Sequence, residues 1–167
     1  MPTTVLSNVA TLAPRHLKPA PIGHATLSMR QGTRVDTDSL RGHVTLVNYW
    51  ASWCTICRTE LPALDSMRRA WSNGEAVFLS VNADASPVLA DRFLRSTGLA
   101  FDYAVGGPKA GALVHAPGLP FTVLLDREGR IVQHWAGYTG REQMNEIDAA
   151  LRLELQAGRP EEHHMHH

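Results

Sequence analysis

One stretch, from Val44 to Pro62, constrains the fold more than any other part of the sequence. It reads V-T-L-V-N-Y-W-A-S-W-C-T-I-C-R-T-E-L-P. Its opening residues are mostly apolar, which is typical of a strand covered on both faces. Apolar residues at helical spacing follow at Leu61, Leu64 and Met67. The stretch therefore predicts a buried central strand that turns into a helix at a pair of cysteines.

Strand and helix patterns alternate along the next part of the chain. A second buried strand is predicted over Ala76 to Val81, which reads A-V-F-L-S-V. A helix should follow, with Ser86 as its N-cap, Pro87 at its first position and Gly98 at its end. Because successive strands separated by helices need crossover connections, we expect parallel pairing with right-handed crossovers.

A hairpin and a closing helix are predicted at the C-terminal end. Phe121 to Leu125 and Ile131 to Trp135 have the composition of two antiparallel strands joined by a tight turn. Thr139 and Glu142 have the spacing of a capping box, and the helix that follows is expected to stop at Gly158. The sheet should therefore contain both parallel and antiparallel strands.

Shorter elements are predicted elsewhere. Ala25 to Val35 indicates a hairpin that turns at Gln31-Gly32, and its two arms are expected to be edge strands. After the second helix, Leu99 to Val105 predicts a short strand and Lys109 to His115 one or two helical turns.

The length and charge of the chain limit its domains and its partners. With 167 residues the chain has room for one domain. We assign residues 1–23, which are rich in proline, to an extended N-terminal linker, residues 24–158 to the domain, and residues 159–167 to a disordered tail or tag remnant. The 16 Lys and Arg residues balance the 16 Asp and Glu residues, so we expect no nucleic acid partner.

The apolar segments also bear on membrane insertion and localisation. No run of 18 or more apolar residues occurs, so the sequence predicts no membrane span. Residues 1–21 lack the basic start and the uninterrupted apolar stretch of a signal peptide. Two localisations are therefore open: the periplasm, with an export signal or anchor removed, or the cytoplasm.

Cys54 and Cys57 are the only cysteines of the chain. A disulfide scaffold would need several cysteines and a structural zinc site four ligands, so two thiols at this spacing favour a redox pair. At the start of a helix, Cys54 would meet unpaired N–H groups and the positive end of the helix dipole, which stabilise a thiolate. Cys57 lies further into the first turn, so we expect Cys54 to attack and Cys57 to resolve the mixed disulfide. An inert pair or half of a metal site is the alternative.

Two separate motifs resemble those of a known family. W-A-S-W-C-T-I-C-R-T-E-L-P is similar to the active-site signature of TlpA/ResA/DsbE-type thiol-disulfide oxidoreductases of the thioredoxin superfamily. G-L-P-F-T-V-L-L-D-R-E-G-R-I-V, residues 118–132, resembles their second signature. The resemblance extends from about Ala25 to Leu155. It implies an α/β thioredoxin-like fold, with a central mixed β-sheet flanked by helices, an N-terminal β-hairpin extension and an inserted αβ unit.

The resemblance also implies a substrate-binding edge near the cysteines. It predicts that the Leu119–Pro120 peptide is cis and faces the pair. The backbone of Leu119 could then pair with an extended peptide beside Cys54, and Trp53 would offer that peptide an apolar contact. Trp50 is expected in the core. An ordinary turn proline before a strand is the alternative for Pro120.

Glu60 is the candidate for proton transfer. The resemblance places a carboxylate one helical turn beyond Cys57, whereas Asn48, in the preceding strand, stands where thioredoxin has a buried Asp. A partly buried carboxylate there could take or give the Cys57 proton. The alternative is a solvated helix side chain beside Arg58 and Arg68, because helical periodicity places Glu60 next to the apolar face. Single polar residues near strand ends, such as Asp84, are given no role.

Together these observations predict a thiol-disulfide oxidoreductase that exchanges dithiol and disulfide with protein substrates and requires no cofactor or metal. The resemblance implies a reductant of exported proteins, such as in cytochrome c maturation, supplied by a membrane or soluble thiol electron donor. The dipeptide Thr55-Ile56 differs from those frequent in reducing relatives, so an oxidase or isomerase stays open. A copper or zinc carrier and a redox-inert binding module are the alternatives from other classes.

Overall fold

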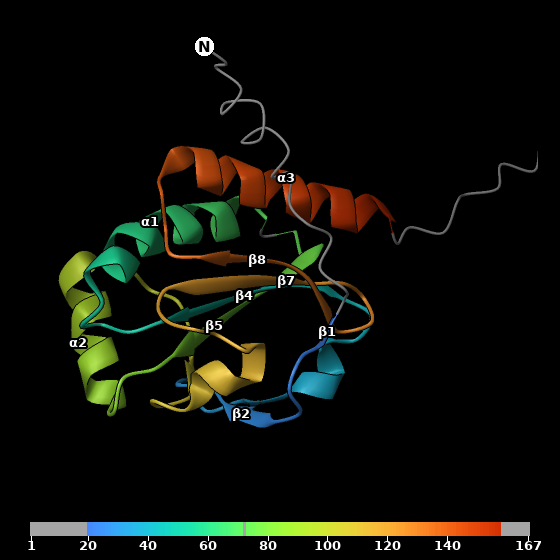
Figure 1. Cartoon of the computed structure of the whole chain (residues 1–167). Coiled ribbons are helices and arrows are strands. Elements are labelled where there is room, and N and C mark those ends of the chain that lie inside the picture. Colours follow the sequence, from blue (N-terminus) through green and yellow to red (C-terminus); the bar gives the residue numbers. More distant parts are fainter. Residues whose placement is uncertain (1–19, 72, 158–167) are drawn as a thin grey trace, which may run out of the picture.

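The computed structural model describes residues 20–71 and 73–157 of the chain (Figure 1). Most of the predicted N-terminal linker, the predicted tail and the predicted helix end at Gly158 lie outside these residues. Ala20 and Pro21, at the end of the predicted linker, form β1 and pair with Ile131 and Arg130. The main sheet therefore includes residues that the sequence pattern assigned to the lead-in.

The described residues form one mixed sheet of six strands in the order β1-β8-β7-β4-β5-β6. Neighbouring β4, β5 and β6 are parallel, whereas β7 pairs antiparallel with both β4 and β8. This confirms the predicted combination of parallel crossovers and a C-terminal hairpin. The strands are β1 Ala20–Pro21, β4 Val44–Trp50, β5 Ala76–Asn82, β6 Ala104–Val105, β7 Phe121–Leu125 and β8 Arg130–Ala136.

Strand β4 is the centre of the molecule, as its sequence predicts. Every one of its residues is buried, and it has strand partners on both sides. In this register Asn48 lies between Ser80 of β5 and Thr122 of β7. The central strand therefore places a polar side chain among the apolar ones, directly behind the turn that carries the cysteines.

Two layers cover the sheet. The helices α1 (Thr55–Ala70) and α3 (Arg141–Ala157) lie on one side, and η2 (Ala110–Val114) and strand β2 (Thr26–Ser28) lie on the other (Figure 1). On the helical side the core combines Leu46 with Leu64 and Ile147. On the opposite side Val47 and Tyr49 pack in a cluster that also holds Val114 and Leu27. Successive residues of β4 thus supply both cores, as the period of two in a strand requires.

Helix α2 (Pro87–Thr97) connects β5 to β6 and has the predicted ends. Ser86 Oγ accepts a hydrogen bond from the Val88 N–H at 3.3 Å, and Pro87 takes the first helical position. Gly98 closes the helix with φ +71°, a conformation that favours glycine because it has no Cβ. Both ends of α2 therefore lie where the sequence signals predict them.

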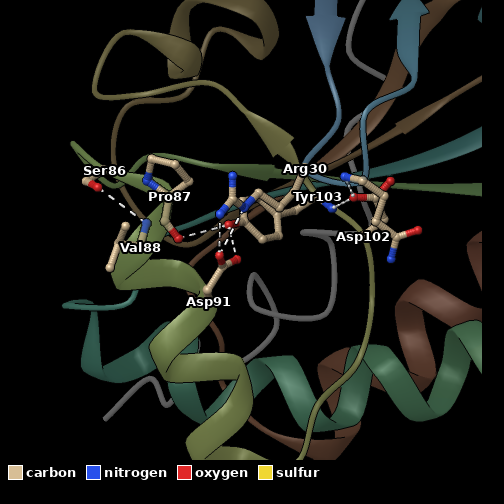
Figure 2. A network of polar contacts seen from close by, with 8 residues as sticks. Arg30, Ser86, Pro87, Val88, Asp91, Asp102 and Tyr103 are labelled. Atoms are coloured by element: carbon tan, nitrogen blue, oxygen red, sulfur yellow. Dashed lines mark hydrogen bonds and ion pairs between the residues drawn. The ribbon is translucent and has the colours of Figure 1, made fainter.

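A polar network fastens α2 to the N-terminal hairpin (Figure 2). Arg30 donates to Asp91 Oδ2 at 2.7 Å, and the Tyr103 hydroxyl donates to Asp91 Oδ1 at 2.6 Å. Asp102 Oδ1 accepts a hydrogen bond from the Gln31 N–H at 3.0 Å. The hairpin, α2 and the segment before β6 are therefore held together by side chains far apart in the sequence.

The hairpin forms as expected. Its arms, β2 and β3 (Arg34–Asp36), pair with each other in a separate two-stranded sheet, so each arm is an edge strand, and a single bridge joins Met29 to Ala104 of β6. Leu27 of this hairpin packs into the core. The turn η1 (Thr37–Leu40) follows it.

The predicted strand from Leu99 to Val105 is also shorter than expected, because only Ala104 and Val105 pair with β5. The residues before them bond elsewhere: the Tyr103 carbonyl accepts a hydrogen bond from the Arg30 N–H at 2.8 Å. The segment therefore holds the hairpin turn and does not extend β6.

The predicted capping box at the start of the closing helix is wrong, because a residue other than Glu142 bonds back to Thr139. Helix α3 begins at Arg141, after Gly140 with φ +118°. Gln143 Oε1, not the Glu142 carboxylate, accepts a hydrogen bond from the Thr139 N–H at 2.8 Å. The glycine turn delays the helix start, so the side chain that reaches back lies one residue later.

Candidate active site

The cysteines lie where the strand β4 passes into α1. Cys54 is the N-cap of α1, and its Sγ accepts a hydrogen bond from the Cys57 N–H at 3.2 Å. Cys54 and Cys57 form a disulfide, and their Cα atoms are 5.2 Å apart. An N–H group and the positive end of the helix therefore point at the Cys54 sulfur, and both would stabilise a thiolate there.

The two cysteines differ in exposure in the predicted direction. Cys54 is 7% exposed and Cys57 is 0% exposed. Ser52 and Trp53 precede Cys54 in the turn, and the side chain of Trp53 is 68% exposed. An incoming protein can therefore meet Cys54 next to an exposed indole, while Cys57 stays enclosed.

Glu60 is buried behind the cysteines and bonded to the central strand. It is 1% exposed, so it does not occupy the solvated position that the sequence left open. Asn48 Nδ2 donates to Glu60 Oε1 at 2.7 Å and to Thr122 Oγ1 at 3.0 Å. Burial raises the pKa of the Glu60 carboxyl from its ordinary 4.5 to about 7, and the hydrogen bond from Asn48 partly opposes this rise.

The expected neighbours of Glu60 have other partners. Arg68 donates to Asp65 Oδ1 at 2.6 Å, and the Arg58 guanidinium lies over the Phe93 ring at 5.0 Å. Neither arginine therefore contacts the Glu60 carboxylate. Thr122, in contrast, belongs to the site and was not predicted, because only the pairing of β4 with β7 places it beside Asn48.

A second buried carboxylate supports the turn before Cys54. Asp84 is 2% exposed, and it accepts hydrogen bonds from the Ser52 N–H at 3.0 Å and the Ser52 hydroxyl at 2.7 Å. Asn82 Nδ2 donates to the same carboxylate at 2.8 Å. The sequence interpretation gave Asp84 no role. Its position just after β5, parallel to β4, could have indicated it, since the carboxyl ends of parallel strands meet at one edge.

A groove runs along the surface beside the cysteines. Its volume is about 750 Å³, and Trp53 and Leu119 both line it. The Leu119–Pro120 bond is cis. The Pro120 carbonyl accepts a hydrogen bond from the Gly137 N–H, but among the described residues none bonds to the main chain of Leu119. The other lining residues are Tyr49, Ala83, Ala85, Pro108, Lys109, Gly111, Ala112, Ala116, Pro117 and Gly118.

Potential metal ligands gather at one other place. His24 Nδ1 lies 3.2 Å from Asp38 Oδ2 and 4.0 Å from Asp36 Oδ1; His24 and Asp38 are exposed and Asp36 is half-buried. Among residues 20–71 and 73–157 this is the only group of three or more His, Cys, Asp and Glu ligands, and neither cysteine belongs to it.

The fold and the site define the class of protein. A thioredoxin-like sheet that carries a Cys-x-x-Cys disulfide at a helix start is that of a thiol-disulfide oxidoreductase. The chain belongs to the AhpC/TSA family, whose model matches residues 18–150.

Known relatives agree with this assignment. The chain is 24% identical over 119 residues to the thiol-disulfide oxidoreductase ResA of Bacillus thuringiensis subsp. konkukian, which covers 70% of this chain and 68% of that protein. It is 36% identical over 104 residues to the thiol:disulfide interchange protein HelX of Rhodobacter capsulatus, covering 61% of this chain and 57% of HelX.

Solved structures show the same fold. One is a protein from Chlorobium tepidum proposed to be the thiol:disulfide interchange protein DsbE, with a TM-score of 0.74 and 24% identity over 83% of this chain and 97% of that chain. A secreted thiol-disulfide isomerase from Corynebacterium glutamicum and a secreted disulfide oxidoreductase from Mycobacterium tuberculosis are among the similar structures. No helix within the described ranges is long and apolar enough to cross a membrane.

Proposed function

We propose that the protein reduces disulfides in exported proteins by dithiol–disulfide exchange, with Cys54 as the nucleophile. The observation that carries this proposal is the Cys54 sulfur at the N-terminus of α1, 3.2 Å from the Cys57 N–H. A thiolate held by a backbone N–H and a helix dipole is ready to attack a disulfide at neutral pH.

The exchange proceeds in two displacements. The Cys54 thiolate attacks one sulfur of the substrate disulfide, and the other sulfur leaves as a thiolate that takes a proton from water. Cys57 then loses its proton and attacks Cys54 Sγ, which releases the second substrate sulfur. Two electrons pass to the substrate, and a membrane or soluble thiol donor reduces the Cys54–Cys57 disulfide again.

Glu60 is the proposed acceptor of the Cys57 proton. Cys57 is enclosed, so its proton cannot pass directly to bulk water. Glu60 lies one turn further along α1 and is buried at the same helix face. A carboxyl with a pKa of about 7 is partly ionised near neutral pH and can both take and return a proton.

The groove beside Trp53 and Leu119 is the proposed docking site of the substrate. The main chain of Leu119 offers hydrogen-bonding groups to an extended peptide, and Pro120 has no N–H that would compete for it. The exposed Trp53 ring, which also lines the groove, adds apolar contact area for the peptide.

The proposal also includes the direction of electron transfer, from the protein to its substrate, and the compartment and pathway in which the protein acts. Stable disulfide substrates occur in oxidising compartments, so the protein would act in the periplasm. The similarity to ResA, HelX and a DsbE-like structure supports a reductant of exported proteins, such as in cytochrome c maturation.

Trapping tests this proposal directly. In Cys57→Ala, Cys54 cannot be released by its partner and should stay in mixed disulfides, which mass spectrometry of the non-reduced adducts identifies. The Cys54→Ala variant is the matched control and should trap nothing. Adducts on Cys54 with exported cysteine-containing proteins support the proposal. Equal labelling of both variants, or only cytoplasmic partners, would contradict it.

A further inference from the structure

The groove beside the cysteines carries one charged side chain among its described residues, that of Lys109. The other described residues that line it are apolar or small, apart from the Tyr49 hydroxyl, and none is acidic. Lys109 is exposed, and its ammonium group forms no ion pair or hydrogen bond with any residue of the described ranges. The groove therefore presents an unpaired positive charge on an otherwise uncharged surface.

A second hollow adjoins the groove at Lys109. Its volume is about 440 Å³, and it lies between η2 and the hairpin strand β2. Lys109 and Ala112 line both hollows, so Lys109 stands at the border between them. Among the described residues that line the second hollow none is acidic, and its only other ionisable side chain is His24. A carboxylate beside Lys109 would therefore meet no negative charge from these walls.

The segment that carries Lys109 is fastened to the central strand on both sides. Just before it, the Pro108 carbonyl accepts a hydrogen bond from the Tyr49 hydroxyl at 3.4 Å. Just after it, Gly111 packs so closely against Tyr49 that a Cβ at this position would lie 2.9 Å from the ring. The backbone of Lys109 is therefore held in place at the groove, although its side chain is exposed.

Asn82 connects this segment with the turn before the cysteines. Its carbonyl accepts hydrogen bonds from the Gly106 and Gly107 N–H groups, both at 3.1 Å. Its side-chain amide donates to Asp84 at 2.8 Å, and Asp84 accepts from the Ser52 N–H at 3.0 Å. Because Asn82 is only 2% exposed, one buried residue fixes the two walls of the groove relative to each other. The positive charge thus keeps a set place relative to the disulfide.

We propose that Lys109 selects the substrate, and that the preferred partners are protein segments with an acidic residue close in sequence to the reactive cysteine. When the substrate cysteine meets Cys54, the segment extends along the groove, and a carboxylate on it pairs with the Lys109 ammonium group. This inference rests on the proposed docking of the substrate in the groove and adds the charge of the docked segment.

The exposure of Lys109 sets the size of the selection. Ion pairs between exposed side chains contribute modestly, because water and salt screen them. The second-order rate constant for disulfide reduction should therefore be about two- to fivefold higher for an acidic peptide than for a neutral one. A lysine at the same peptide position should lower the rate constant, because like charges across an interface repel.

Single-turnover kinetics with matched peptides test this selection. Each peptide carries one cysteine as a mixed disulfide with a small neutral thiol, and Glu, Gln or Lys is placed at successive positions on either side. The rate constant of the reduced protein is divided by that of dithiothreitol with the same peptide, which removes the effect of the charge on the disulfide itself. Wild type should prefer Glu to Gln and Gln to Lys, and the preference should shrink as salt is added.

Substitutions of Lys109 assign the preference to the groove. Lys109→Gln should bring the ratio of the Glu and Gln rate constants close to one, Lys109→Glu should reverse the preference, and Lys109→Arg should keep it. Arg34→Gln is the matched control, because it removes the same charge from an exposed position on β3 that lines neither hollow. This control should keep the wild-type preference.

The selection and the proposed function fail in different ways. If wild type reduces the peptides without distinguishing Glu from Lys, or if Lys109→Gln keeps the full preference, the selection is overturned and the reductase activity stands. If the reduced protein reduces none of the peptides, the proposed function fails and the selection fails with it. A crystal structure of the Cys57→Ala mixed disulfide with the best acidic peptide should place its carboxylate within hydrogen-bonding distance of Lys109 Nζ, and a carboxylate bound elsewhere overturns the selection.

Discussion

Replacing Glu60 with Gln should change how stability depends on pH. Glu60 has a pKa of about 7 in the folded protein and about 4.5 when unfolded, so between these values the folded state binds more protons. Its contribution is therefore fully present below about pH 4.5 and is lost as the pH rises through 7. A difference of about 2.5 in pKa corresponds to about 3 kcal/mol, which is a large part of the stability of a small domain.

Urea denaturation of the oxidised protein measures this effect, because the disulfide keeps the cysteines from titrating. The free energy of unfolding is compared at about pH 4 and about pH 8. Wild type should lose about 3 kcal/mol more than Glu60→Gln over this interval. Glu146→Gln, at an exposed position on α3, is the matched control and should follow wild type. Parallel losses in wild type and Glu60→Gln would refute the reasoning that burial holds the Glu60 proton.

Three further substitutions, one of them with a comparison variant, test separate parts of the structure. Asp84→Ala should lower the free energy of unfolding by about 1–3 kcal/mol and slow disulfide exchange, because the Ser52 and Asn82 donors lose their acceptor. Ser52→Ala keeps the hydrogen bond from the Ser52 N–H to Asp84, so its stability and its exchange rate should fall less. Trp53→Ala should change the free energy of unfolding by less than about 0.5 kcal/mol, because the side chain is exposed, and should raise KM for a peptide disulfide with little change in kcat. A fall in kcat with an unchanged KM would argue against a docking role. Gly98→Ala should lower the free energy of unfolding by about 1–2 kcal/mol and leave the exchange rates unchanged, because φ +71° is unfavourable for alanine. An unchanged stability in thermal or urea unfolding would contradict this role of Gly98 at the end of α2.

The parts of the fold that could be predicted are those set by local sequence. The buried strand β4, the helix start at Cys54, and the Ser86, Pro87 and Gly98 signals of α2 all depend on residues close together in the chain. The disulfide pair belongs to this group, because its geometry follows from one helical turn.

The parts that could not be predicted depend on contacts between distant elements. Helical periodicity placed Glu60 beside the apolar face, but the buried face of α1 is wide enough to include Glu60 and Asp65. What holds Glu60 there is Asn48 on β4, and Asn48 in turn is bonded to Thr122 on β7. No pattern within α1 carries that information.

The same limit explains the hairpin and Asp84. The alternation in the hairpin predicts two paired strands, but that Leu27 packs into the core depends on the distant residues that it meets there. Asp84 resembles any polar residue after a strand until Ser52, 32 residues earlier, is seen to donate to it twice.

The central claim is that Cys54 and Cys57 are a working redox pair. Its most direct test is the reduction potential of the pair, measured by equilibration of the purified protein with glutathione or dithiothreitol buffers and quantification of the free thiols. The account predicts a reversible two-electron transition between about −120 and −300 mV. A pair that does not cycle, or whose potential lies well below about −300 mV as in structural disulfides, would contradict it.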